Sequence, residues 1–189
     1  MEEGVDEEVA VAGAQGDGPT MREVLSSFCT GVAVITAVEP DGRPTGMAVQ
    51  SFSSVSLEPP LVCFCPAHTS TAWPRIRAAG RFAVNILSAE QQALCGQFAV
   101  TGEEKFQGVD WRPGANGAPL LDGALATIEC ELAGTFPGGD HTIALGRATA
   151  LDRLPGAEPL LYFRCAYGRL RSSSSRSASI ASARSRSEA

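Results

Sequence analysis

No charged side chain occurs between Arg43 and Glu58, and this uncharged segment constrains the fold more than any other part of the 189-residue chain. Apolar and small polar residues alternate along its second half. Phe52, Ser54 and Ser56 would share one face of an extended chain, with the intervening residues on the other face. The alternation predicts a β-strand, although a purely structural strand would be richer in valine and isoleucine.

The serine-rich composition of this strand admits two interpretations. Small hydroxyl groups and backbone amides on a rigid sheet suit a ligand with an apolar face and a polar edge, such as a flavin. The alternative is an antiparallel strand pair with one wet face, and composition alone favours this plainer interpretation.

The rest of the chain predicts mostly strands. Gly31–Val38 is an apolar run rich in Val, Ile and Thr, and Pro40-Asp41-Gly42 is a turn signal that leads into a second strand over Thr45–Gln50. Further strands are expected over 61–65, 82–87, 124–136, 142–151 and 160–165. Because helices do not alternate regularly with the strands, we expect an all-β barrel with short helical insertions.

Helices are expected over 20–29, 70–79 and 88–100. The first and third begin with the spacing of a capping box, as in Thr20 and Glu23. The second begins at Thr69-Ser70-Thr71, whose hydroxyls suit a phosphate group or act as simple helix caps.

The charge is uneven along the chain, which has a net charge of −6. Residues 1–20 contain six acids and no base, whereas residues 171–189 contain four arginines and one acid. We expect one domain over 20–170 and disordered tails over 1–19 and 171–189. The acidic body disfavours nucleic acid as a partner.

The chain lacks any run of roughly 18 apolar residues, so no membrane span is expected. Its acidic N-terminus has no cationic region of a signal peptide, so we expect a cytoplasmic protein. The six cysteines form no C-x-x-C pair and are interpreted as buried free thiols. A metal or redox pair at Cys63 and Cys65 is the less favoured alternative.

Several common catalytic motifs are missing. The sequence contains no G-x-G-x-x-G after a strand and no phosphate-binding P-loop, so a Rossmann unit would not hold a nicotinamide cofactor. With two histidines in the chain, no metal-ligand cluster is expected. The absence of a G-x-S-x-G elbow disfavours a hydrolase.

Taken together, five motifs in order resemble the short-chain NAD(P)H:flavin oxidoreductases, the reductase components of two-component flavin-dependent monooxygenases. The resemblance extends from about Phe28 to Leu170. The motifs are F-x-T-G-V-A-V-I-T from Phe28, the run from Gly46 to Val62, G-R-F-A-V-N-I-L from Gly80, E-K-F from Glu104 and G-D-H-T from Gly139. Ala48 and Gln50 depart from the threonine and asparagine common in the family.

This resemblance implies the FMN-binding split barrel, a mainly β, Greek-key-like fold that is normally a homodimer with the flavin near the subunit interface. It implies hydride transfer from NADH or NADPH, with NADH favoured, to FMN or FAD. The reduced flavin would then diffuse to a partner monooxygenase. No nucleic acid, membrane or metal is implied.

The resemblance also implies roles for particular residues. The residues expected around the flavin ring are Ala48, Val49, Gln50, Ser51 and Phe52. Those expected at its ribityl and phosphate end are Ser54, Thr69, Ser70 and Thr71. His141 and Tyr167 would face the nicotinamide, and Lys105 would contact a cofactor phosphate or belong to a loop that closes over the site.

Plainer interpretations of the last three residues stay open. His141 would then be a solvated turn histidine, Lys105 a member of a loop ion pair and Tyr167 an aromatic plug of the core. At the level of the whole protein, the alternatives are a flavin-binding electron carrier or sensor without turnover, an oxidase built on the same barrel, and an interaction module that uses the tails.

Overall fold

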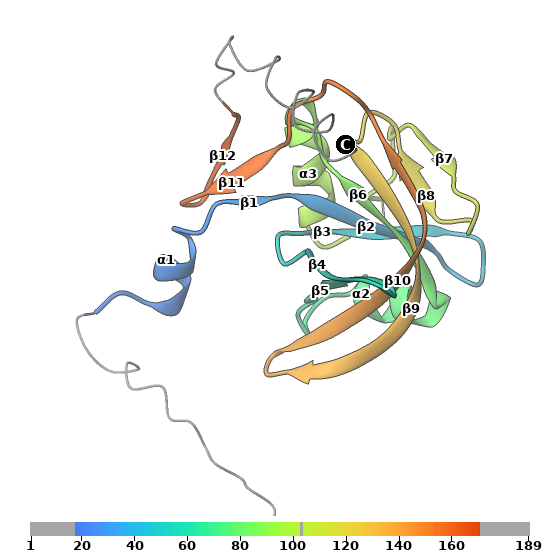
Figure 1. Cartoon of the computed structure of the whole chain (residues 1–189), viewed down its shortest axis with the longest axis horizontal. Coiled ribbons are helices and arrows are strands. Elements are labelled where there is room, and N and C mark those ends of the chain that lie inside the picture. Colours follow the sequence, from blue (N-terminus) through green and yellow to red (C-terminus); the bar gives the residue numbers. More distant parts are fainter. Residues whose placement is uncertain (1–17, 103, 171–189) are drawn as a thin grey trace, which may run out of the picture.

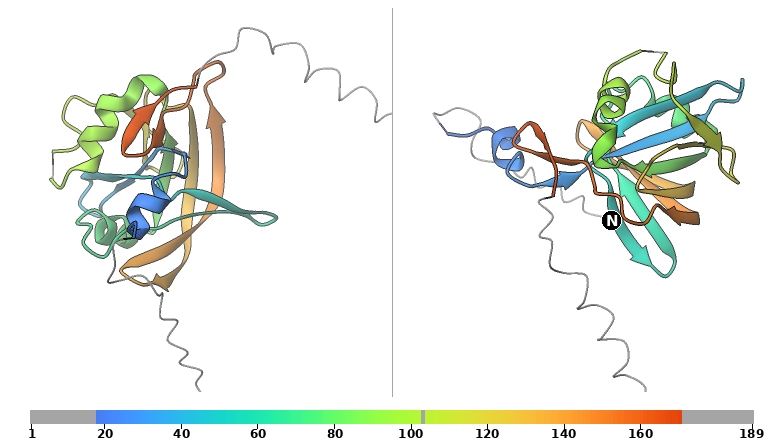
Figure 2. Two further views of the ribbon diagram at one scale, coloured as in Figure 1. Left: turned by 90° about the vertical axis from the view of Figure 1, so that its left-hand side faces the viewer. Right: turned by 90° about the horizontal axis from the view of Figure 1, so that it is seen from above.

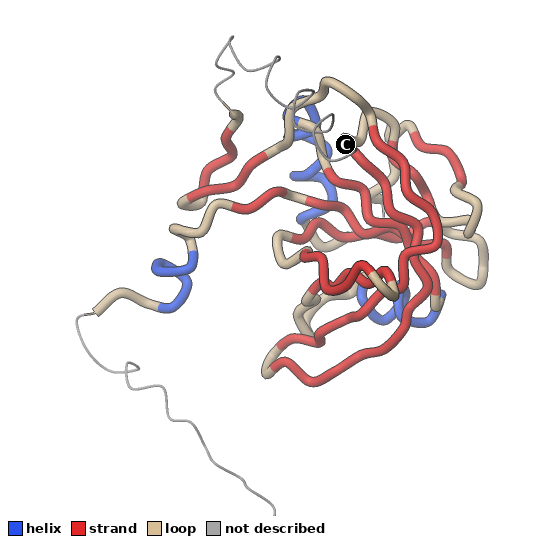
Figure 3. The backbone as a smooth tube through the Cα atoms, viewed as in Figure 1, coloured by secondary structure: helices blue, strands red, loops and turns tan. Residues whose placement is uncertain are grey.

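The computed structural model describes residues 18–102 and 104–170, and strands make up most of the ordered elements (Figures 1 and 3). The helices are α1 (Met21–Leu25), α2 (Trp73–Ala79), the 3-10 helix η1 (Ala89–Gln91) and α3 (Gln92–Ala99). The strands are β1 (Thr30–Gly31), β2 (Ala33–Val38), β3 (Pro44–Val49), β4 (Ser53–Leu57), β5 (Pro60–Phe64), β6 (Arg81–Ile86), β7 (Trp111–Pro113), β8 (Pro119–Leu121), β9 (Ala126–Gly138), β10 (His141–Arg153), β11 (Leu161–Phe163) and β12 (Ala166–Gly168).

Seven strands form one sheet in the order β3-β2-β6-β9-β10-β5-β4, and each neighbouring pair is antiparallel. The two edge strands, β3 and β4, follow each other in the chain with only residues 50–52 between them. The sheet must therefore curl until its edges approach, yet β3 and β4 are not hydrogen-bonded neighbours. This is the split barrel that the family resemblance implies, with the short helical insertions that the sequence pattern predicts.

The core of the barrel has two main apolar clusters. In the first, the ring of Phe64 meets the edges of Trp73 and Phe82 at centroid distances of 5.6 and 5.4 Å. Through Trp73 and Ile76, this cluster fixes α2 to the barrel. The second cluster includes Phe98 of α3 and thereby fixes that helix on another part of the sheet.

Gly146 of β10 lies where the core leaves no room for a side chain. A Cβ atom there would lie 2.5 Å from the Phe82 ring and 3.2 Å from the Cys130 Cβ. Because Phe82 and Cys130 are both fully buried, we expect Gly146→Ala to lower the free energy of unfolding by about 1–3 kcal/mol in urea titrations. Gly96→Ala in α3 is the matched control, since no atom beyond its chain neighbours and the helix's own backbone lies within 4 Å of its Cβ position. The control should be neutral or stabilising, and an equal loss in both variants would contradict this packing.

Three predictions about the elements need correction. The expected helix over 20–29 ends at Leu25, although its Thr20–Glu23 capping box is present. The helix expected from position 70 begins at Trp73. Three short strands were not predicted by the pattern: β7 and β8 within residues 102–123, and β12 after the strand predicted over 160–165.

The cysteines also differ from their predicted burial. Cys95 and Cys130 are buried, and burial raises the pKa of the Cys130 thiol to about 12. Cys29 and Cys165 are exposed, and the other two are half-buried. Apolar neighbours in sequence favour burial, but Cys165 lies in a hairpin turn, where its φ is 62°.

The predicted tails lie almost wholly outside the described residues, so their order stays a prediction. Within the described part of the chain, no helix is both long enough and apolar enough to cross a bilayer.

Candidate functional site

The main cavity, of about 530 Å³, is lined by the end of β3, the link that follows it, the segment after β5, the start of β10, α3 and the β11–β12 hairpin. Its apolar lining comes from Val32, Met47, Ala48, Val49, Ala67 and Ala99. Its polar and sulfur-bearing lining comes from Gln50, Ser51, Cys65, Cys95, His141, Tyr162 and Tyr167. Such a mixture suits a flat ligand with an apolar face and a hydrogen-bonding edge.

Ser51 joins the link after β3 to the segment after β5 at the cavity wall. Its Oγ accepts a hydrogen bond from the Cys65 amide at 2.9 Å and lies 3.3 Å from the Cys65 carbonyl oxygen, to which it donates. The side chain thus replaces a missing strand-to-strand ladder between the 50–52 link and the end of β5. The backbone next to the cavity is thereby held in one conformation.

Six of the twelve predicted site residues line this cavity: Ala48, Val49, Gln50, Ser51, His141 and Tyr167. Phe52 instead packs against the first core cluster, and Ser54 is exposed on β4. The Ser70 hydroxyl accepts a hydrogen bond from the Trp73 amide and contacts the Met47 sulfur at 3.7 Å. Ser70 therefore links the start of α2 to the cavity wall, and Thr69 is exposed beside it.

Lys105 lies in a small notch beside the main cavity, with Thr71 and Arg75. Its Nζ donates to the carbonyl oxygens of Gly46 and Phe98, both at 3.2 Å. Burial, and then the nearby Arg75 charge, lower the pKa of Lys105. The ammonium group thus ties its loop to both β3 and α3, next to the strand that lines the cavity.

His141 begins β10 and lies at the cavity edge, where its side chain is 42% exposed. Its Nδ1 lies 2.6 Å from Asp140 Oδ1, and this hydrogen bond is the main cause that holds the pKa of Asp140 below its ordinary value. With Asp140 ionised, Nδ1 carries the proton and donates. The pair therefore fixes the ring and leaves Nε2 for a ligand.

Tyr167 reaches the cavity from the β11–β12 hairpin. It is paired directly with Tyr162 across the hairpin, and the two rings meet edge to face at 5.2 Å. Its hydroxyl lies 3.3 Å from the Cys95 thiol, and this contact is the main reason that the pKa of Tyr167 is raised to about 12. The phenol therefore stays protonated at neutral pH and can donate a hydrogen bond.

Tyr162, Cys95 and Cys65 were not predicted as site residues. For Tyr162 the sequence did offer a signal, namely an aromatic side chain directly before Phe163 in a predicted strand. The two cysteines gave none, because a cysteine in an apolar run looks like any small core residue.

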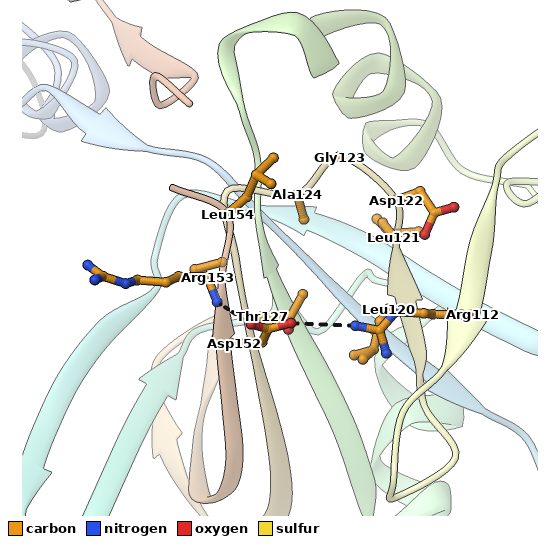
Figure 4. A pocket seen from close by; sticks show the side chains of 11 residues that line it. Arg112, Leu120, Leu121, Asp122, Gly123, Ala124, Thr127, Asp152, Arg153 and Leu154 are labelled. Carbon is orange, nitrogen blue, oxygen red and sulfur yellow. Dashed lines mark hydrogen bonds and ion pairs between the residues drawn. The ribbon is translucent and has the colours of Figure 1, made fainter. Parts of the chain in front are cut away.

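A second hollow of about 170 Å³ lies between the ends of β8, β9 and β10 (Figure 4). In Figure 4 Arg112 points toward Asp152, and the two are 3.6 Å apart. None of the predicted site residues lines this hollow. We therefore place the candidate site at the main cavity.

The flavin reductase like domain matches residues 25–171, which include every strand of the barrel and every residue of the cavity lining. The chain belongs to the flavin reductase family. This flavin reductase homologue is 46% identical to the reductase subunit HsaB of a flavin-dependent monooxygenase from Rhodococcus jostii over 158 residues, 84% of this chain and 80% of HsaB. It is 45% identical to a flavin reductase from Pseudomonas putida, with 80% of this chain and 89% of that protein covered.

Solved structures agree with this membership. Nitrilotriacetate monooxygenase component B from Mycobacterium thermoresistibile superposes with a TM-score of 0.77 at 45% identity, over 79% of this chain and 84% of that one. The NADH:FAD oxidoreductase SgcE6 of Streptomyces globisporus, solved with NAD and FAD fragments, also gives a TM-score of 0.77, at 38% identity over 81% of this chain and 92% of SgcE6.

Proposed function

We propose that this protein is an NAD(P)H:flavin oxidoreductase that supplies reduced FMN or FAD to a separate monooxygenase. The observation that carries the proposal is the main cavity, because its lining combines apolar residues with side chains that form hydrogen bonds. A bound flavin supplies the ring that accepts the hydride, so the protein needs no nucleophile of its own. Its task is to bind and orient the two ligands.

The end of β3 and the link after it fit a flavin ring. Ala48 and Val49 contribute apolar lining, and Gln50 and Ser51 contribute an amide and a hydroxyl. Ser51 holds this backbone in place through Cys65. The nicotinamide would lie nearer His141, whose free Nε2 accepts a hydrogen bond from a carboxamide, and Tyr167, whose protonated hydroxyl donates one.

The ribityl and phosphate end of the flavin is proposed to run toward the start of α2. Thr71 and Lys105 share the notch beside the cavity, and Ser70 touches Met47 of the cavity wall. Lys105 places positive charge there. Roles for Phe52, Ser54 and Thr69 in flavin binding remain predictions, because these side chains lie outside both linings.

Occupancy of the cavity can be measured without turnover. Cys65 lines the cavity, whereas Cys63, two residues earlier on β5, does not. We expect saturating FMN or FAD to slow alkylation of Cys65 by N-ethylmaleimide at least about fivefold, because the ligand covers the thiol. Mass spectrometry reads both cysteines in one sample, with Cys63 as the internal control. Equal protection of both thiols, or of neither, would place the flavin elsewhere.

A homodimer is also proposed, because α1 displays an apolar face that the described part of the chain leaves exposed. It is five residues long and buries no side chain; Met21 is 76% exposed and Val24 and Leu25 are each 57% exposed, and Phe28, three residues after the helix, is 75% exposed. α1 stands away from the barrel (Figures 1 and 2). Helices this short are not stable in water without tertiary contacts. A second copy of the chain would supply them.

Leu25→Glu is expected to convert the dimer to a monomer in sedimentation velocity, because the charge would be buried in the proposed interface. Arg22→Glu is the control, since Arg22 lies outside the apolar i, i+3, i+4 face of the helix. Dissociation by both variants, or by neither, would argue against this interface.

We also propose a cytoplasmic location. All six cysteines are unpaired, which is typical of a reducing compartment. No role for nucleic acid or metal is proposed.

A further inference from the structure

The β11–β12 hairpin, which brings Tyr162 and Tyr167 to the cavity, is separate from the seven-stranded sheet. It belongs to a three-stranded sheet in the order β1-β11-β12, and β1 contributes only two residues. In Figure 1 the hairpin lies beside β1, outside the barrel wall. The two tyrosines pack against the second core cluster, and their position also depends on the few polar contacts that fasten this hairpin.

Several of these contacts lead to the short turn formed by η1. At the entry to the hairpin, the Ala89 amide donates to the Glu158 carbonyl at 2.8 Å. At the exit, the Arg169 guanidinium binds both carboxylate oxygens of Glu90, at 2.6 and 3.3 Å, and the Ala89 carbonyl at 3.3 Å. A forked arginine contact of this kind fixes direction as well as distance.

The second fastening comes from the same helical unit. α3 starts directly after η1 and carries Cys95, whose thiol contacts the Tyr167 hydroxyl. Tyr167 and Arg169 are two residues apart, so they lie on the same side of an extended chain. The end of the hairpin thus holds η1 and α3 at two points. Tyr167 contacts α3 at the cavity, and Arg169 contacts η1 outside it.

We propose that Glu90 and Arg169 are a positioning pair for the ligand site. They act through Tyr167 by holding the end of β12 against η1, and neither lines the cavity. This inference rests on the proposed function, because its consequence is ligand affinity. An ion pair whose side chains are 55% and 79% exposed contributes little to global stability. Its loss should therefore leave the barrel folded while the hairpin shifts.

The test compares Arg169→Gln, Glu90→Gln and the charge-swapped double variant Glu90→Arg with Arg169→Glu. Each single variant is expected to raise the Kd for FMN or FAD, or the KM for NADH, at least about threefold, with kcat within about twofold of wild type. The double variant should recover most of this loss, because the exposed pair can form with its charges exchanged. Flavin Kd is read from flavin fluorescence without nicotinamide, so one readout is independent of turnover.

Arg43→Gln is the matched control, because Arg43 forms a similarly exposed ion pair with Asp41, at 2.8 Å, outside the cavity lining. It should leave Kd and KM unchanged. Unchanged values in both single variants, or no recovery in the double variant, would overturn the positioning role. If the wild-type protein bound neither flavin, this result would instead contradict the proposed function, and the positioning role with it.

Discussion

His141→Ala is expected to raise the KM for NADH at least about tenfold, with a much smaller change in kcat, because tenfold corresponds to losing about 1.4 kcal/mol of binding. The physical reason is the loss of a ring that Asp140 holds at the cavity edge. Steady-state kinetics at saturating flavin measures the effect. Asp140→Asn should raise KM less, because it frees the ring without removing it.

His68→Ala is the control for this prediction. His68 is exposed and adjoins the same turn, where its amide donates to the Asp140 carbonyl at 2.9 Å, but its side chain does not line the cavity. A KM that rises equally in His68→Ala, or that stays at the wild-type value in His141→Ala, would contradict the placement of nicotinamide beside His141.

Asn85→Leu is expected to lower the free energy of unfolding by about 4 kcal/mol, because each buried polar group left without a partner costs about 1–3 kcal/mol. Asn85 is fully buried on β6. Its Oδ1 accepts from the Leu121 amide at 2.8 Å, and its Nδ2 donates to the Thr36 hydroxyl at 3.0 Å and to two backbone carbonyls at 3.3 Å. One side chain thus joins β2, β6 and β8.

Urea titration gives the unfolding free energy for this comparison. Thr36→Val is the companion variant, since it removes one hydroxyl of the same network, which donates to the Pro119 carbonyl at 2.6 Å. It should cost about 1–2 kcal/mol, less than Asn85→Leu, because the Asn85 amide and the Pro119 carbonyl keep their hydrogen bond to each other when the hydroxyl is lost. If Asn85→Leu costs no more than Thr36→Val, Asn85 is not the centre of the network.

The barrel strands could be predicted wherever an apolar pattern met a clear turn signal. The β2–β3 hairpin has a run of Val, Ile and Thr followed by Pro40-Asp41-Gly42, and the long β9–β10 pair turns at Gly139 and Asp140. Strands of three residues have no such period. β7 and β8 lie in a segment rich in proline and glycine, and only their pairing with each other makes them strands.

The candidate site was predictable where one short motif supplies it and unpredictable where distant segments meet. Ala48 to Ser51 are consecutive, and His141 belongs to a short turn motif, so the resemblance reached both. Cys95 and Tyr162 approach Tyr167 because α3 and β11 pack beside β12, across 72 residues in the case of Cys95. The Glu90–Arg169 pair spans 79 residues and has no local pattern either.

The central claim is that this chain reduces free flavin with electrons from reduced nicotinamide. The most direct measurement follows NADH and NADPH absorbance near 340 nm with purified protein and increasing FMN or FAD. We expect saturable loss of absorbance that depends on added flavin, with turnover many times the amount of enzyme. A protein that binds flavin tightly but does not consume NADH or NADPH at any flavin concentration would contradict the claim.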